Sequence, residues 1–183
     1  MACATTHIVE RWTAPGLTAA DLEFQHVIAI AAVPEPSRQR LVEDALARAA
    51  TRTRVTPAYT ILEPEHRADV EQLRTVLERH GIDGAITVRL VGVEETQTYV
   101  PPAHRYAGGY YGYYGAVGPR VYQPGYVVTD THVVVETSLY DVAGGRMLWT
   151  GISRTFNPGS VDDLIGEIAI AARNELRDEG LLP

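Results

Sequence analysis

Residues 127–156 read VVTDTHVVVETSLYDVAGGRMLWTGISRTF, and this stretch decides the fold. Apolar and polar side chains alternate in its first half, where Val133, Val135 and Leu139 fall on one face. A period of two predicts a strand with one covered face. Gly144-Gly145 provides the positive-φ residues of a tight turn, and the rest of the stretch returns as a second strand. We therefore expect an antiparallel hairpin.

The segments outside the hairpin alternate between strand and helix patterns. In chain order they read as strand 26–33, helix 37–52, strand 55–62, helix 65–80, strand 84–100 and, after the hairpin, a helix that begins at Ser160. Pro57 removes a backbone donor, so strand 55–62 should be an edge strand. The predicted class is α/β (α+β), with a mixed five-stranded sheet in the order β-α-β-α-β-β-β-α and helices packed on it. Right-handed crossovers should put the first two helices on one face.

The 183 residues suit one domain. We expect residues 1–24 to be an N-terminal tether without a clear period, docked through Trp12. Residues 25–183 would form a single α/β domain with a Tyr/Gly-rich loop at 101–126. No apolar run is long enough for a membrane-spanning helix. The net charge is −7 and no residue is lysine, a balance that argues against a nucleic-acid partner.

The loop is the feature that the fold does not require. Residues 105–126 hold seven of the ten tyrosines, interleaved with glycine. Tyrosine offers a large apolar face with a polar tip, which suits a binding surface. An insertion that is merely tolerated, or a hairpin tip packed on its own molecule, explains the composition equally well. The candidate binding residues are Tyr106, Tyr110, Tyr111, Tyr113, Tyr114, Tyr122, Tyr126 and, if it is exposed, Trp149.

No signature of a reaction is present. The chain has no glycine-rich phosphate loop, no Gly-x-Ser-x-Gly elbow and no histidine pair at metal-ligand spacing. We therefore expect no catalytic residue, no metal and no cofactor. The alternative is an enzyme or small-ligand binder, which requires a cleft near the loop and the strand ends where His104, His132, Glu136 and Arg154 converge. Self-association through the edge at 55–62 is a third possibility.

The single cysteine lies near the start, in Met-Ala-Cys-Ala-Thr-Thr. A small residue before cysteine is typical of the end of a bacterial lipobox, in which Cys3 receives a lipid. The charged and apolar regions of a signal peptide do not precede it, so we expect the natural chain to begin further upstream. A cytosolic thiol is the alternative interpretation of Cys3.

Several of these features together resemble small bacterial envelope lipoproteins of unknown function. They are Cys3, the strand HVIAIAAV at 26–33, the run ITVRLV that follows Asp83-Gly84-Ala85, and TDTHVVVETSLYDVAGGRMLWTGISRTFNP at 129–158. The element order is also similar to the N-terminal domain of TolB of the Tol-Pal system and to CsgG-type periplasmic domains. The resemblance implies a non-enzymatic periplasmic module, anchored to the outer membrane by lipid, that binds an envelope protein or cell-wall component. It transfers no active-site residue.

Overall fold

The computed structural model describes residues 5–63, 69–101 and 125–182. Its strands are β1 (Thr5–Thr13), β2 (His26–Ala32), β3 (Arg54–Pro57), β4 (Gly84–Val100), β5 (Tyr126–Asp141) and β6 (Arg146–Phe156). Its α-helices are α1 (Pro36–Ala49), α2 (Val70–Arg79) and α4 (Val161–Asp178), and two short 3-10 helices are η1 (Ala19–Leu22) and η2 (Ala58–Thr60).

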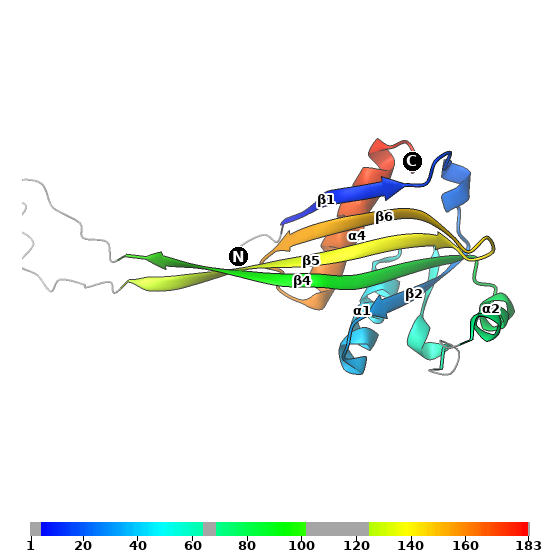
Figure 1. Ribbon diagram of the computed structural model, residues 1–183, viewed down its shortest axis with the longest axis horizontal. Coiled ribbons are helices and arrows are strands. Elements are labelled where there is room, and N and C mark those ends of the chain that lie inside the picture. Colours follow the sequence, from blue (N-terminus) through cyan, green and yellow to red (C-terminus); the bar gives the residue numbers. More distant parts are fainter. Residues whose placement is uncertain (1–4, 64–68, 102–124, 183) are drawn as a thin grey trace, which may run out of the picture. The chain divides into compact units, whose positions relative to one another are not determined.

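The strands form one mixed sheet in the order β1-β6-β5-β4-β2-β3 (Figure 1). Strand β2 is parallel to both β3 and β4, and β6 is antiparallel to both β5 and β1. The predicted mixed sheet with helices packed on it is confirmed. The sheet has six strands rather than five, because part of the supposed tether is a strand.

The additional strand is β1, which pairs along β6 from Thr5 opposite Phe156 to Thr13 opposite Trp149. Trp12 lies in this strand opposite Thr150 and is 46% exposed, and the backbone pairing of β1 with β6 holds the segment on the sheet. Most of β1 is exposed, so its sequence carries no alternation of apolar and polar residues. Periodicity reveals a strand only where one face is covered, which explains why sequence reasoning missed it.

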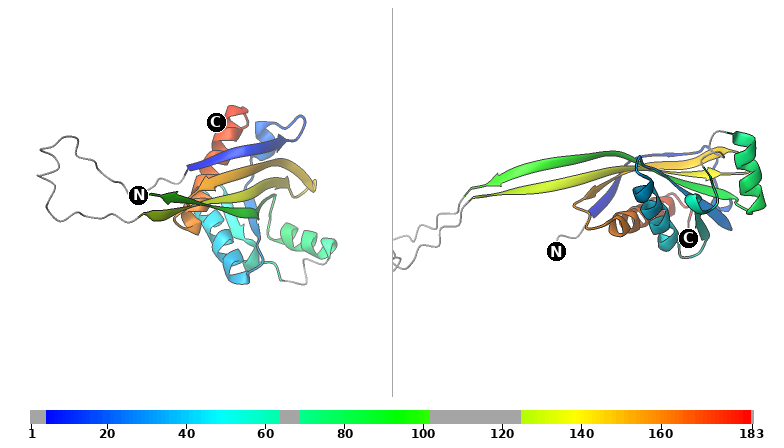
Figure 2. Two further views of the ribbon diagram at one scale, coloured as in Figure 1. Left: turned by 60° about the vertical axis from the view of Figure 1, so that its left-hand side comes forward. Right: turned by 90° about the horizontal axis from the view of Figure 1, so that it is seen from below.

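The helices cover both faces of the sheet. Helices α1 and α4 share one face, where their apolar side chains meet Ala29 of β2 and Val88 of β4. Figure 2 shows these two helices on the same side of the sheet. Leu77 of α2 instead packs with Ile28 and Ala85. Because successive side chains of a strand point to opposite faces, Ile28 and Ala29 assign α2 and α1 to different layers.

The expectation that the first two helices share a face was therefore wrong. The chain moves outward from β2 to β3 and then back across β2 to β4. Two right-handed crossovers that run in opposite directions across a sheet place their helices on opposite faces.

Three element boundaries also differ from the predictions. Strand β3 ends at Pro57 and the chain continues as η2, although β3 does lie at the predicted edge. Helix α1 starts at Pro36 instead of being capped by Ser37, since proline is preset for the first helical position. Helix α2 begins at Val70, where the Asp69 carboxylate accepts from the amides of residues 71 and 72. Ser160 does cap α4, as predicted.

The chain divides into two compact units. One comprises residues 1–94 and 132–183, and the other comprises residues 95–131. The larger unit contains the helices and the three apolar clusters of the core. Within the smaller unit, the described residues other than Pro101 and Gly125 belong to the end of β4 and the start of β5.

Candidate functional site

Most of the predicted tyrosine surface lies outside the described residues, namely Tyr106, Tyr110, Tyr111, Tyr113, Tyr114 and Tyr122, as does Cys3. Tyr126 is described, and its side chain is 61% exposed. Trp149 is fully buried in a cluster with Leu176 and Leu181, so it belongs to the core and is not available to a partner.

The smaller unit presents further apolar side chains at its strand ends. Tyr99 in β4 is 62% exposed and Val127 in β5 is 57% exposed. The Tyr99 ring lies close over Gly125, where an added Cβ would stand 2.7 Å from the ring carbon Cζ. Glycine at 125 thus allows the ring to lie against the neighbouring backbone. Exposed aromatic and branched side chains flank residues 102–124 on both sides in sequence.

The predicted cleft around His132 does not form among the described residues. The His132 ring packs against Phe156 with the ring centroids 5.2 Å apart. The side chains of Glu136 and Arg154 are occupied separately, Glu136 by Arg89 and Arg154 by Glu94. His104 lies outside the described residues. His132, Glu136 and Arg154 line neither the hollow beside the α1–β3 loop nor the apolar space beneath α4.

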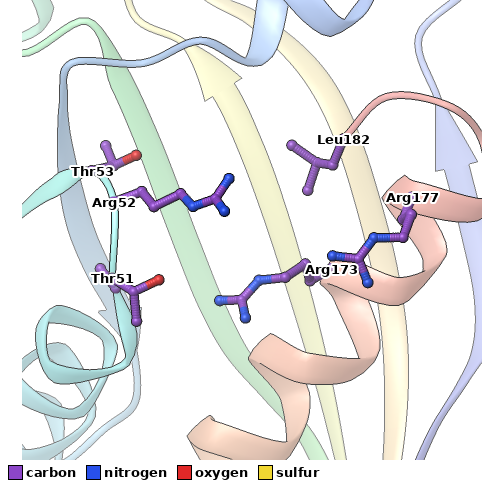
Figure 3. Close-up of a pocket in the computed structure, with 7 residues that line it drawn as sticks. Thr51, Arg52, Thr53, Arg173, Arg177 and Leu182 are labelled. Carbon is purple, nitrogen blue, oxygen red and sulfur yellow. The ribbon is translucent and has the colours of Figure 1, made fainter.

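A hollow of about 350 Å³ opens between the loop that joins α1 to β3 and the last turns of α4. Its walls include Thr51, Arg52, Thr53, Arg173, Arg177 and Leu182. In Figure 3 Arg52 reaches from the loop toward α4, and Arg173 reaches back toward the loop. The spacing of Arg173 and Arg177 by four residues puts both on one side of α4.

The charge around this hollow is unbalanced. None of the described residues that line it is acidic, although the protein carries a net charge of −7. Among the described residues, no ion pair is found for Arg52 or Arg173. Glu175 and Glu179 of α4 both pair with Arg11 of β1.

Arg48 provides a contrast on the neighbouring helix. Its guanidinium Nη2 lies 2.5 Å from the Asp162 carboxylate, and this hydrogen bond raises the pKa of Arg48. Arg48 therefore has its ion-pair partner in place, whereas the described residues provide none for Arg52 or Arg173.

A second, apolar chamber of about 170 Å³ lies beneath α4. Its walls include Leu46, Ile86, Leu139, Ile165, Ile168 and Leu176. Two other wall residues, Thr137 and Trp149, are 4% and 0% exposed, and the described part of the chain offers no hydrogen-bond partner to the Thr137 hydroxyl or the Trp149 indole N–H. Arg173 and Leu182 line both the chamber and the arginine hollow, so the two spaces adjoin.

The sequence analysis predicted neither the arginine hollow nor the apolar chamber. The only local signal was the four-residue spacing of Arg173 and Arg177, and charged residues at that spacing usually lie on a solvated helix face. Only the packing of α4 beside the α1–β3 loop brings Arg52 next to them.

The described ranges 5–63, 69–101 and 125–182 contain no group of three or more His, Cys, Asp or Glu side chains arranged to hold a metal ion. No helix within them is long and apolar enough to cross a bilayer.

No protein-family model matches the chain, and no curated protein is significantly similar to it. The similar solved structures include a PelC variant from Paraburkholderia phytofirmans, crystallised as a dodecamer, with 13% identity over 92% of this chain and 94% of that chain and a TM-score of 0.47. A second PelC dodecamer structure from that organism has 12% identity, coverages of 92% and 95%, and a TM-score of 0.44.

The lipoprotein GNA1162 from Neisseria meningitidis is also similar, with 16% identity over 84% of this chain and 98% of that chain and a TM-score of 0.41. Identities and TM-scores this low say nothing about function. The expected similarity to TolB and to CsgG-type domains stays a prediction.

Proposed function

We propose that this protein is a non-enzymatic binding or assembly module of the bacterial cell envelope. It would be held at the periplasmic side of the outer membrane by a lipid on Cys3. Its Tyr/Gly-rich segment and the adjoining strand ends would contact an envelope protein or a cell-wall component.

One observation carries the proposal. Tyr99 and Tyr126, at the ends of the strands that flank residues 102–124, are each more than three-fifths exposed. Large apolar side chains normally lose about 1.5–3 kcal/mol of favourable burial when they stay in water, so a cluster of them on a surface suits a partner that covers them. Tyrosine is favoured in such surfaces because it fixes much contact area with few rotatable bonds.

The compartment is tested with the full-length gene and its native leader, by membrane fractionation and the intact mass of the mature protein. We expect a membrane-bound form whose mass is increased by a diacylglyceryl and an acyl group at Cys3. An unmodified protein in the cytosol would overturn the envelope assignment.

The binding surface is tested by photo-crosslinking in the living bacterium. A photoreactive phenylalanine replaces Tyr126 in one strain and Leu41, an exposed apolar residue of α1, in the control strain. We expect a discrete crosslinked product from position 126 that position 41 does not give, and its loss on competition with the unlabelled protein. Equal products from both positions, or none from position 126, would refute the surface.

A further inference from the structure

We propose that the arginine hollow and the apolar chamber together form a binding site for a small anionic amphiphile, a molecule with a carboxylate or phosphate head and a short apolar chain. The inference is independent of the tyrosine surface, because every residue that lines the site belongs to the larger unit.

The head of the ligand is selected by the arginines. Arg52 and Arg173 face one opening with no ion-pair partner among the described residues, and Arg177 lines the same opening. Like charges gathered in one place repel one another, and a bound anion relieves that repulsion. A guanidinium forms two parallel hydrogen bonds to a carboxylate or phosphate, so this opening favours an oxyanion.

The tail of the ligand is selected by the chamber. Its volume of about 170 Å³ is close to the roughly 150 Å³ of an engineered apolar cavity that binds benzene, although the space in this protein opens toward the arginine hollow. A group of about six carbons therefore fits.

Arg173 links the two halves of the site, since it lines both spaces. Arginine commonly buries its aliphatic stem along apolar surface while its charged head stays at the rim. The stem of Arg173 can thus contact the apolar chain of a ligand whose head its guanidinium binds. A molecule that is only charged, or only apolar, would use half of the site.

The test is isothermal titration of the full chain with acetate, butyrate, hexanoate, octanoate, octyl phosphate and octanol, with tryptophan emission recorded in parallel. We expect affinity to rise about fourfold for each added methylene until the chamber is filled. Octyl phosphate and octanoate reveal which head is preferred, and octanol should bind far more weakly than either. Failure of both anions to bind, or acetate or octanol binding as tightly as octanoate, would overturn the proposal.

The matched variants are Arg173→Ala and Arg48→Ala. Both residues are exposed arginines on neighbouring helices, but Arg48 is paired with Asp162 and does not line the hollow. We expect R173A to weaken octanoate binding at least about tenfold, as befits lost hydrogen bonds to a charged group, and R48A to leave it unchanged. Ala172→Leu, which places a larger side chain at the chamber wall, should abolish the dependence on chain length. Equal binding by R173A and R48A would refute the assignment, whether or not A172L folds.

Discussion

Replacing Glu43 should destabilise the protein strongly, because its carboxylate holds together three elements of the larger unit. Glu43 lies in α1 and is completely buried. Its oxygens accept hydrogen bonds from the amide of Ala31 at 3.1 Å, the amide of Tyr59 at 2.9 Å and the side-chain nitrogen of Gln39 at 2.8 Å. The Glu43 carboxylate of α1 thus accepts hydrogen bonds from one backbone amide near the end of β2 and one in η2.

The cost follows from these contacts. Glu43→Ala leaves two backbone donors without partners, each worth about 1–3 kcal/mol when buried, so we expect a loss of about 2–6 kcal/mol in the free energy of unfolding. That is a large part of the roughly 5–15 kcal/mol that stabilises a typical domain. Glu43→Gln keeps the shape but has one acceptor oxygen instead of two, and we expect a loss of about 1–3 kcal/mol.

The assay is urea unfolding followed by the fluorescence of buried Trp149. Asp44→Ala is the matched control. Asp44 is the next residue of the same helix and accepts from the Tyr59 hydroxyl at an exposed site, so its loss should cost less than about 1 kcal/mol. If E43A costs no more than D44A, Glu43 does not hold these elements and the reasoning fails.

Four further substitutions test other parts of the fold. Burial lowers the pKa of His26 from 6.5, so the unfolded chain binds a proton first and the free energy of unfolding should fall as the pH drops below about 6.5; His26→Asn should flatten this trend in urea titrations from about pH 8 to about pH 5. Ser160→Ala removes the cap of α4 and should cost about 1 kcal/mol in thermal unfolding, whereas an unchanged melting temperature would contradict the capping role. Gly151→Ala would place a Cβ 2.8 Å from Cζ2 of Trp149, so we expect a loss of about 1–3 kcal/mol and a red-shifted emission, while Gly166→Ala in open helix should stabilise by up to about 1 kcal/mol.

The hairpin and the last helix were predictable because their signals are local. Strand β6 has the predicted bounds, and β5 begins within one residue of its predicted start. Alternation, a glycine turn and a serine cap all act within a few residues of one another. The candidate surface was predictable only in part. Tyr126 is exposed as expected, whereas Trp149, on a strand that alternates equally well, is buried.

The sequence by itself therefore determined the types of the elements other than β1 and η2 and the mixed sheet with its β3 edge, and it predicted the tyrosine-rich segment as a candidate binding surface. The tertiary structure alone decided that β1 joins the sheet, that α1 and α2 lie on opposite faces, and that Arg52 meets Arg173 across more than a hundred residues. The physical reason is the range of the forces concerned. Propensity and periodicity act between neighbours along the chain, whereas strand pairing, layer choice and the convergence of charges depend on which distant segments pack together.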